Sequence, residues 1–196
     1  MRSALVLCGG ESLRMGRDKA TLPFAGEALV ARVSRLVSQA VDEVVWVARP
    51  GQDLPATTAT VVRDAEEGLG PLSALAAGLR AVSGDLVFVT ACDTPLLRPA
   101  VAARLFDLAG AHDACVPVLG GVAMTLCAVY RRTVADEAER LVAARQLAVR
   151  GLLDRVNVKR VDAAAFRDID PQLDSFLSCD TPAQVADALR RSGIRT

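Results

Sequence analysis

The chain has 196 residues, enough for one domain with a substantial core, and its 23 basic and 23 acidic residues give a formal net charge of zero. This balance, with only five Phe, one Tyr and one Trp, argues against a general nucleic-acid surface and against a base-stacking platform. No apolar run reaches the roughly 18–20 residues that a membrane span needs, and no signal peptide precedes the first predicted strand. The sequence therefore predicts a cytoplasmic protein that binds neither nucleic acid nor membrane.

The first stretch, residues 4–19, begins as a short apolar run, which predicts a buried strand, and continues as a polar loop. The adjacent Gly9 and Gly10 let backbone N–H groups approach an anion, and Arg14 and Lys19 supply opposing charge. The spacing matches neither the Walker loop nor the Rossmann fingerprint. An ordinary basic turn is the alternative, but so many glycines and cations behind one strand favour a phosphate-binding loop.

Predicted helices and strands alternate through the first half of the chain. They are a helix over residues 27–40, a strand at 43–48, a short strand at 59–63 that ends at Asp64, a helix from Pro71 to about Val82, and a strand at 86–91. This order predicts an α/β fold with a mainly parallel sheet. In the commonest doubly wound order the strand at 86–91 lies beside the first strand, so that Gly9-Gly10 and Asp93 face one crevice.

The second half continues with both element types and contains no internal repeat. Its predicted elements are a helix over residues 99–109, strands at 114–118 and 126–130, helices around 133–143 and 146–153, a strand at 157–161, and a last helix begun by Pro182, with Asp180 or Thr181 as N-cap. We expect one domain over residues 1–196.

The five cysteines are odd in number and contain no C-x-x-C pair, which indicates neither a disulfide framework nor a zinc site. We interpret them as structural, with Cys8 and Cys92 merely near the site. The lone histidine, His112, is expected at the surface between a helix and a strand.

Residues 7–19, Leu-Cys-Gly-Gly-x-Ser-x-Arg-Met-Gly-x-Asp-Lys, resemble the L-A-G-G-x-S-x-R-M-G-x-D-K signature of the molybdenum cofactor guanylyltransferases, a family of nucleotidyltransferases. The one departure is Cys8, where that family usually has Ala. The resemblance implies a three-layer Rossmann-like nucleotidyltransferase fold. It also implies transfer of GMP from GTP to the terminal phosphate of molybdenum-molybdopterin, with Mg²⁺ as cofactor and pyrophosphate as second product.

Nucleotidyl transfer brings two anions together, because an acceptor phosphate oxygen attacks the α-phosphorus of a nucleoside triphosphate. The protein must therefore supply positive charge through backbone N–H groups, cations and a metal ion. We expect Arg14, Lys19 and Asp93 to be catalytic, the two cations facing the triphosphate and Asp93 holding the metal. The segment Cys92-Asp93-Thr94-Pro95 resembles the family's C-D-x-P segment, which carries its metal-binding Asp. The alternatives are a solvated loop role for Lys19 and a turn or capping role for Asp93.

The resemblance also implies a set of nucleotide contacts. Asp64 matches an Asp that contacts the nucleotide in the family, and Gly70-Pro71-Leu72 matches a G-P-L loop near the guanine base. A plain helix start is the alternative for this loop. The expected nucleotide-binding residues are Leu7, Cys8, Gly9, Gly10, Lys19, Asp64, Gly70, Pro71, Leu72 and Asp93.

The match weakens in the later regions, where the family meets its pterin substrate. Arg49 stands where the family often has Asn, Ala123-Met124 replaces an H-P or Q-P segment, and residues 178–182, Ser-Cys-Asp-Thr-Pro, replace N-x-N-T-P. We therefore expect a nucleotide-binding half, residues 1–98, and an acceptor-binding half, residues 99–196. The expected partners are GTP and molybdenum-molybdopterin, with the protein acting as a monomer and contacts to other cofactor-biosynthesis proteins left open. A molybdopterin cytidylyltransferase, a transferase for another phosphorylated acceptor and a non-catalytic nucleotide-binding homologue are the alternatives.

Overall fold

The computed structural model describes residues 1–9, 18–64 and 68–194. Its centre is an eight-stranded sheet with the order β10-β7-β9-β6-β1-β4-β5, and β8 pairs with β7. The strands are β1 (Arg2–Leu7), β4 (Glu43–Ala48), β5 (Thr60–Arg63), β6 (Leu86–Ala91), β7 (Ala114–Leu119), β8 (Val122–Ala123), β9 (Cys127–Arg131) and β10 (Val158–Asp162). The pairs β1–β4, β1–β6, β4–β5 and β7–β10 are parallel, whereas β9 runs antiparallel to its neighbours β6 and β7.

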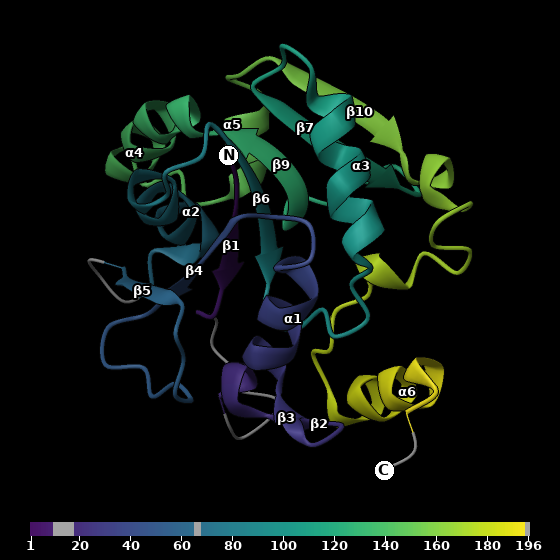
Figure 1. The fold of residues 1–196 in the computed structure, drawn as a ribbon. Helices are drawn as coiled ribbons and strands as arrows, with labels where there is room; N and C mark the ends of the chain where they lie inside the picture. The colour runs from purple at the N-terminus through teal and green to yellow at the C-terminus, as the bar shows by residue number, and fades with distance from the viewer. Residues whose placement is uncertain (10–17, 65–67, 195–196) are drawn as a thin grey trace.

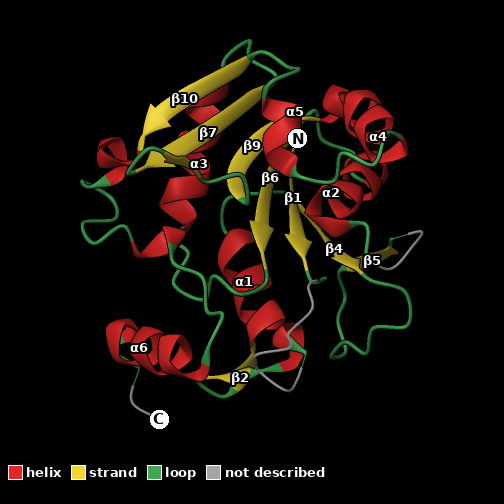
Figure 2. Ribbon diagram, turned by 180° about the vertical axis from the view of Figure 1, so that it is seen from behind, coloured by secondary structure: helices red, strands yellow, loops and turns green. Residues whose placement is uncertain are grey.

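Helices cover both faces of this sheet and give three layers (Figures 1 and 2). The helices are α1 (Leu29–Val37), α2 (Gly70–Ala81), α3 (Pro99–Ala109), α4 (Ala135–Ala143), α5 (Val149–Leu153) and α6 (Pro182–Ser192). In β1, Ala4 and Val6 pack toward α1 and α3, while Leu5 and Leu7 pack toward α2, α4 and α5. Because both faces are covered, the strand is apolar throughout instead of alternating with polar residues.

Helix α6 lies apart from the layers, beside a small hairpin formed by β2 (Pro23–Phe24) and β3 (Glu27–Ala28) (Figure 1). A third apolar cluster joins these elements, with Phe24 and Leu29 packed near Cys179 and Ala188. The last part of the chain is thereby attached to the segment that follows the predicted phosphate loop.

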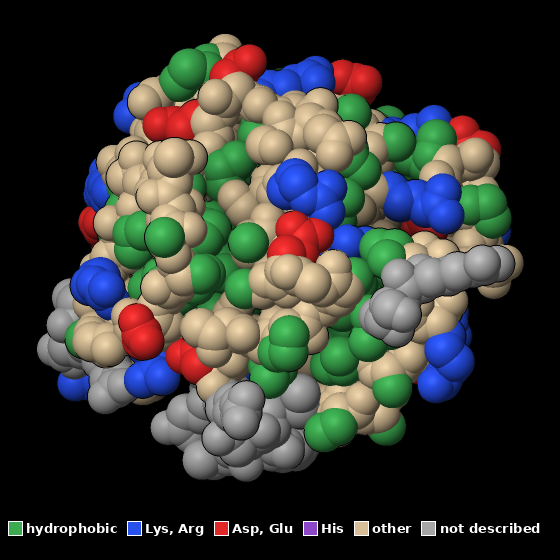
Figure 3. Space-filling view, turned by 60° about the horizontal axis from the view of Figure 1, so that its bottom comes forward, with side chains coloured by type: hydrophobic (Ala, Val, Ile, Leu, Met, Phe, Trp, Pro, Cys, Tyr) green, Lys and Arg blue, Asp and Glu red, His purple; other side chains and the backbone are tan. Residues whose placement is uncertain are grey.

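The structure confirms the predicted position of β6 beside β1, with Leu7 paired to Ala91 at their carboxyl ends. These ends point toward the lower end of Figure 1, where the strand order reverses and ligands of such sheets bind. Figure 3 shows this end of the molecule, on which acidic and basic side chains lie together among apolar and uncharged ones.

The bounds of β4, β6 and α3 agree with the sequence prediction, as does the α/β class with a mainly parallel sheet. The first helix is shorter than the predicted 27–40, because Glu27–Ala28 belong to β3 and the helix ends at Val37. All five cysteines are buried and unpaired, and His112 is partly exposed after α3. In the described part of the chain, no helix combines the length and apolar character needed to cross a membrane.

Close packing of α2 on the sheet depends on Gly78. A Cβ atom at Gly78 would lie 2.6 and 2.9 Å from the two terminal methyl groups of Leu5 and 2.9 Å from a methyl group of Val47. Both neighbours are fully buried. We therefore expect Gly78→Val to lower the free energy of unfolding by about 1–3 kcal/mol, the usual cost of overpacking a core. Urea denaturation would measure the change.

Gly151, in α5, is the matched control, because a Cβ there would meet nothing within 4 Å. We expect Gly151→Val to change the free energy of unfolding by less than about 0.5 kcal/mol, because valine and glycine differ little in helix propensity. Equal losses at the two positions would contradict the packing argument.

Candidate active site

The site lies where β1 and β6 end side by side. Backbone pairing continues one residue beyond each strand, since Cys8 N donates to Val47 O at 2.8 Å and Cys92 N donates to Leu7 O at 3.0 Å. Both thiols are buried, and burial raises the pKa of each above its usual value. They are therefore protonated near neutral pH and are poor nucleophiles, which agrees with the structural role predicted for them.

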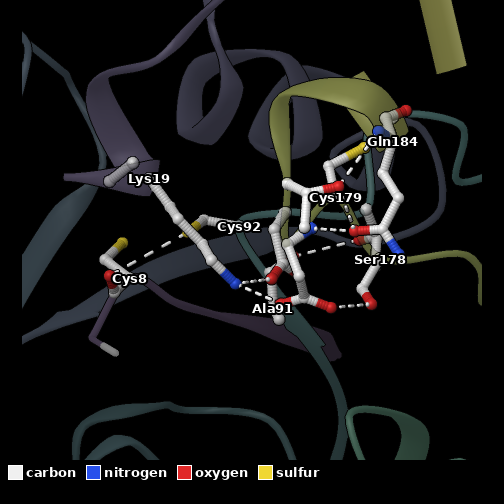
Figure 4. Close-up of polar contacts among 12 residues, drawn as sticks. Cys8, Lys19, Ala91, Cys92, Ser178, Cys179 and Gln184 are labelled. Carbon is white, nitrogen blue, oxygen red and sulfur yellow. Dashed lines mark hydrogen bonds and ion pairs between the residues drawn. The ribbon is translucent and has the colours of Figure 1, made fainter. Parts of the chain in front are cut away.

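Lys19 stands at the centre of the polar contacts. It begins the short 3₁₀ helix Lys19–Thr21, and its Nζ lies 2.8 Å from Asp93 Oδ2 and 2.5 Å from Asp180 Oδ1. Figure 4 shows the lysine side chain reaching across from the side of Cys8 and Cys92 toward the group that contains Ser178, Cys179 and Gln184. Burial alone would lower the pKa of Lys19, but the hydrogen bonds to Asp180 and Asp93 outweigh it and raise this pKa. Lys19 is therefore cationic.

Asp93 follows β6 and is buried, with 11% of its side chain exposed. Burial raises the pKa of this carboxyl group, and the Lys19 ammonium opposes the rise. Its second oxygen, Oδ1, is inaccessible to solvent and accepts no hydrogen bond from any described residue. A buried carboxylate oxygen without a partner is costly unless a cation or donor meets it. This oxygen fits a hard divalent cation, which prefers carboxylate and phosphate oxygens.

Asp180 is brought to the same place by the segment before α6. Cys179 N donates to Asp93 O at 2.9 Å, and Asp180 Oδ2 accepts from Ser178 Oγ at 2.8 Å. Thr181, the alternative to Asp180 as N-cap, caps α6 by accepting from Gln184 N. Asp180 is thus left to face Lys19. No sequence pattern assigned Asp180 to the site, and it falls in the segment of residues 178–182 that departs from the family pattern.

A second polar cluster fixes the residue before Lys19. Gln52 is 2% exposed, and its Nε2 donates to Cys8 O at 2.9 Å and to Asp18 Oδ2 at 2.8 Å. Arg49 pairs with the same Asp18 oxygen at 3.0 Å. The sequence had left the role of Arg49 open, and this ion pair is its contact near the site. The end of β1 is thereby tied to the segment that carries Lys19. Nothing in the sequence had indicated Gln52.

The other predicted site residues are placed as follows. Asp64 follows β5, and its Oδ1 accepts from Ser73 Oγ of α2 at 2.6 Å. Gly70 begins α2 with φ of +70°, a conformation that favours glycine, and Pro71 follows in the first turn. Leu72 is fully buried and Leu7 is 3% exposed, so both side chains belong to the core.

Leu72 could therefore meet a ligand only through its backbone, and the backbone of Leu7 is already engaged, since its O accepts from Cys92 N. Gly9, in contrast, is exposed. Gly10 and Arg14 lie outside the described residues. Among residues 1–9, 18–64 and 68–194, no group of three or more His, Cys, Asp or Glu side chains is arranged to hold a metal ion. A metal at this site would therefore rely on Asp93 and Asp180, with further oxygens supplied by a substrate.

The chain is similar to known proteins in both sequence and fold. A "Probable molybdenum cofactor guanylyltransferase" of Mycolicibacterium paratuberculosis is 39% identical over 165 residues, which cover 81% of this chain and 84% of the relative. The crystal structure of "Molybdopterin-guanine dinucleotide biosynthesis protein A" from Archaeoglobus fulgidus matches with a TM-score of 0.82 and 26% identity, over 98% of this chain and 99% of that one.

The fold alone is shared with a Mycobacterium tuberculosis protein solved in complex with manganese, at a TM-score of 0.59 and 20% identity, over 82% of this chain and 87% of that one. The model of the MobA-like NTP transferase domain matches residues 4–161. This range includes most of β1 and of β10, all the strands of the sheet between them, and both Lys19 and Asp93. The chain therefore belongs to the family of MobA-like NTP transferase domains.

Proposed function

We propose that this protein transfers GMP from GTP to the terminal phosphate of molybdenum-molybdopterin and releases pyrophosphate. The observation that carries the proposal is Lys19, held between Asp93 and Asp180 at the joined ends of β1 and β6. Family membership and the relatives named as guanylyltransferases support the choice of GTP and pterin. The same proposal places the protein in the cytoplasm as a monomer.

The reaction forms one bond and breaks another at the α-phosphorus of GTP. An oxygen of the acceptor phosphate attacks this atom, and the bond to the oxygen that bridges toward the β-phosphorus breaks, so that pyrophosphate leaves with the electron pair. Both reactants are anions, and charge builds on the leaving group. Lys19 is cationic and mostly shielded from water, with 19% of its side chain exposed. It is therefore suited to bind the triphosphate and to stabilise that charge.

Asp93 and Asp180 would hold Mg²⁺. The unpartnered Asp93 Oδ1 supports this assignment. The charge balance supports it too, because two carboxylates face the single ammonium of Lys19 and leave an excess of negative charge. When bound, the ion would neutralise charge on the phosphates of GTP. Lys19 would then exchange its carboxylate partners for phosphate oxygens.

The remaining predicted residues would bind the rest of GTP. We assign the phosphates to backbone N–H groups of Gly9 and Gly10 and to Arg14, and the base to Asp64 and the turn at Gly70, Pro71 and Leu72. Cys8 N already donates to Val47 O and Leu7 O accepts from Cys92 N, so Leu7 and Cys8 would position the two glycines. Asp64 supports this assignment by its position at the carboxyl end of β5, next to Ser73 of α2. A carboxylate can accept both N1–H and N2–H of guanine, an arrangement of donors that adenine and cytosine lack.

Residues 1–98 and 99–196 would then serve mainly the nucleotide and the acceptor, respectively. Asp180 adds one contact that crosses this division, since it comes from the second half and meets Lys19 of the first.

The proposal is tested by measuring pyrophosphate release with GTP, CTP, ATP and UTP, each with Mg²⁺ and molybdenum-molybdopterin. We expect release with GTP to exceed release with the other three nucleotides, and calorimetric titration to show the same preference. A preference for CTP would contradict the guanylyl assignment, and release with none of the four would contradict transferase activity.

Asp93→Asn should lower metal-dependent turnover at least about 100-fold while the protein remains folded, because the amide cannot replace the charge that holds the cation. Steady-state kinetics over a range of Mg²⁺ concentrations would measure the loss. Asp85→Asn is the control, since Asp85 precedes β6 at the opposite end and 87% of its side chain is exposed. Equal turnover by Asp93→Asn and the wild type would contradict the metal role.

Lys19→Ala should raise the dissociation constant of GTP about tenfold or more and leave that of guanosine nearly unchanged, because an ammonium contacts phosphate and not the nucleoside. Calorimetric titration with both ligands gives the comparison. The chain contains one other lysine, Lys159 in β10, and Lys159→Ala is the control. An equal loss for GTP and guanosine in Lys19→Ala would contradict phosphate binding by Lys19.

A further inference from the structure

Asp170 is a buried carboxylate that the proposed reaction does not use. It lies between β10 and α6, in the segment that passes the beginning of α3 (Figure 1), and it is completely inaccessible to solvent. A charged side chain is seldom buried to this extent unless it is paired and hydrogen-bonded. Its contacts therefore indicate what it does.

The carboxylate of Asp170 closes a turn over residues 170–175. Its Oδ2 accepts from Ser175 N at 2.9 Å, and its Oδ1 accepts from Asp174 N at 3.2 Å. Within this turn Leu173 has φ of +57°, an unfavourable backbone conformation for leucine. The turn is therefore one that the chain would not adopt through local preference alone, and two backbone donors depend on Asp170 for their partner.

The same carboxylate joins this turn to the segment that follows Asp93. Arg98, which precedes α3, lies with its Nε 3.2 Å from Asp170 Oδ1, and its backbone N donates to Ser175 Oγ at 2.9 Å. Phe176, the next residue, is buried and packs edge-to-face against Phe166 at 5.7 Å between ring centroids. The start of the final segment is thus fixed against the start of α3.

Four residues separate Ser175 from Asp180, and the far end of this stretch is fixed as well, because Cys179 N donates to Asp93 O at 2.9 Å. We propose that Asp170 is a positioning residue, which holds the segment of residues 174–180 so that Asp180 meets Lys19 and Asp93. This inference rests on the proposed function, in which Asp180 helps to hold the metal. It assigns to a residue remote from the phosphate loop a role in forming the metal site.

The test uses the whole protein and Mn²⁺ as a probe, with affinity for Mn²⁺–GTP taken from water-proton relaxation and affinity for metal-free GTP from calorimetry in a chelator. Asp170→Asn should weaken binding of Mn²⁺–GTP about tenfold or more and leave binding of metal-free GTP within about twofold of wild type. Asp168→Asn is the matched control, because Asp168 lies two residues earlier and pairs with Arg104 at the surface. It should change neither affinity.

A double-mutant cycle separates positioning from general stability. If Asp170 acts through Asp180, then Asp170→Asn should cause no further loss of Mn²⁺–GTP affinity in a protein that already carries Asp180→Ala. An equal loss in both backgrounds, or no loss in the wild-type background, would overturn the inference. If Asp170→Asn does not fold, Ser175→Ala replaces it with the same expected and contrary results, since it removes the acceptor of Arg98 N.

A wild-type protein that binds GTP but gains nothing from Mn²⁺ would overturn the proposed metal site together with this inference. A wild-type protein that binds Mn²⁺–GTP more tightly than GTP, with Asp170→Asn unchanged, would overturn the inference alone.

Discussion

A lysine ammonium between two carboxylates is the interaction on which the described site depends. Asp93 is buried, and its charge is tolerated because Lys19 lies 2.8 Å away, while Asp180 shares the same ammonium at 2.5 Å. The three groups together carry one net negative charge. A divalent cation would bring this group to a net charge of plus one, which suits an anionic triphosphate, and the phosphates would provide the lysine with new partners. The ion pairs therefore keep the three side chains in place until a metal ion takes the position of the ammonium at the carboxylates and phosphates take the position of the carboxylates at the ammonium.

Three separate parts of the chain must meet for this contact to form. The pairing of β1 with β6 places Cys8 beside Cys92 and sets where Asp93 lies. Gln52 and Arg49 hold Asp18, and Lys19 follows directly. The turn closed by Asp170 and the bond from Cys179 N to Asp93 O fix the segment that carries Asp180. Each support is a buried or partly buried hydrogen bond or ion pair, so losing one partner costs the other its contact in a site with little water.

Sequence patterns predicted the sheet and two of the three residues in this group, Lys19 and Asp93. The apolar runs at β1 and β6 identified the two central strands, and right-handed crossover rules placed them side by side, which brought Asp93 near the loop of Lys19. Asp180 was not found, because it lies 161 residues from Lys19 and no periodicity reports which loop reaches which strand end. Gln52 and Asp170 were missed for a related reason, since polar residues in irregular segments reveal their burial only when the tertiary structure is known.

The most direct test of the account is a crystal structure of the protein with Mn²⁺ and a non-hydrolysable GTP analogue, with anomalous scattering used to locate the metal. We expect the manganese peak within coordinating distance of both Asp93 and Asp180, with Lys19 Nζ moved to the phosphates. A metal bound away from these two carboxylates, or a Lys19 still paired with both of them beside bound nucleotide, would contradict the account.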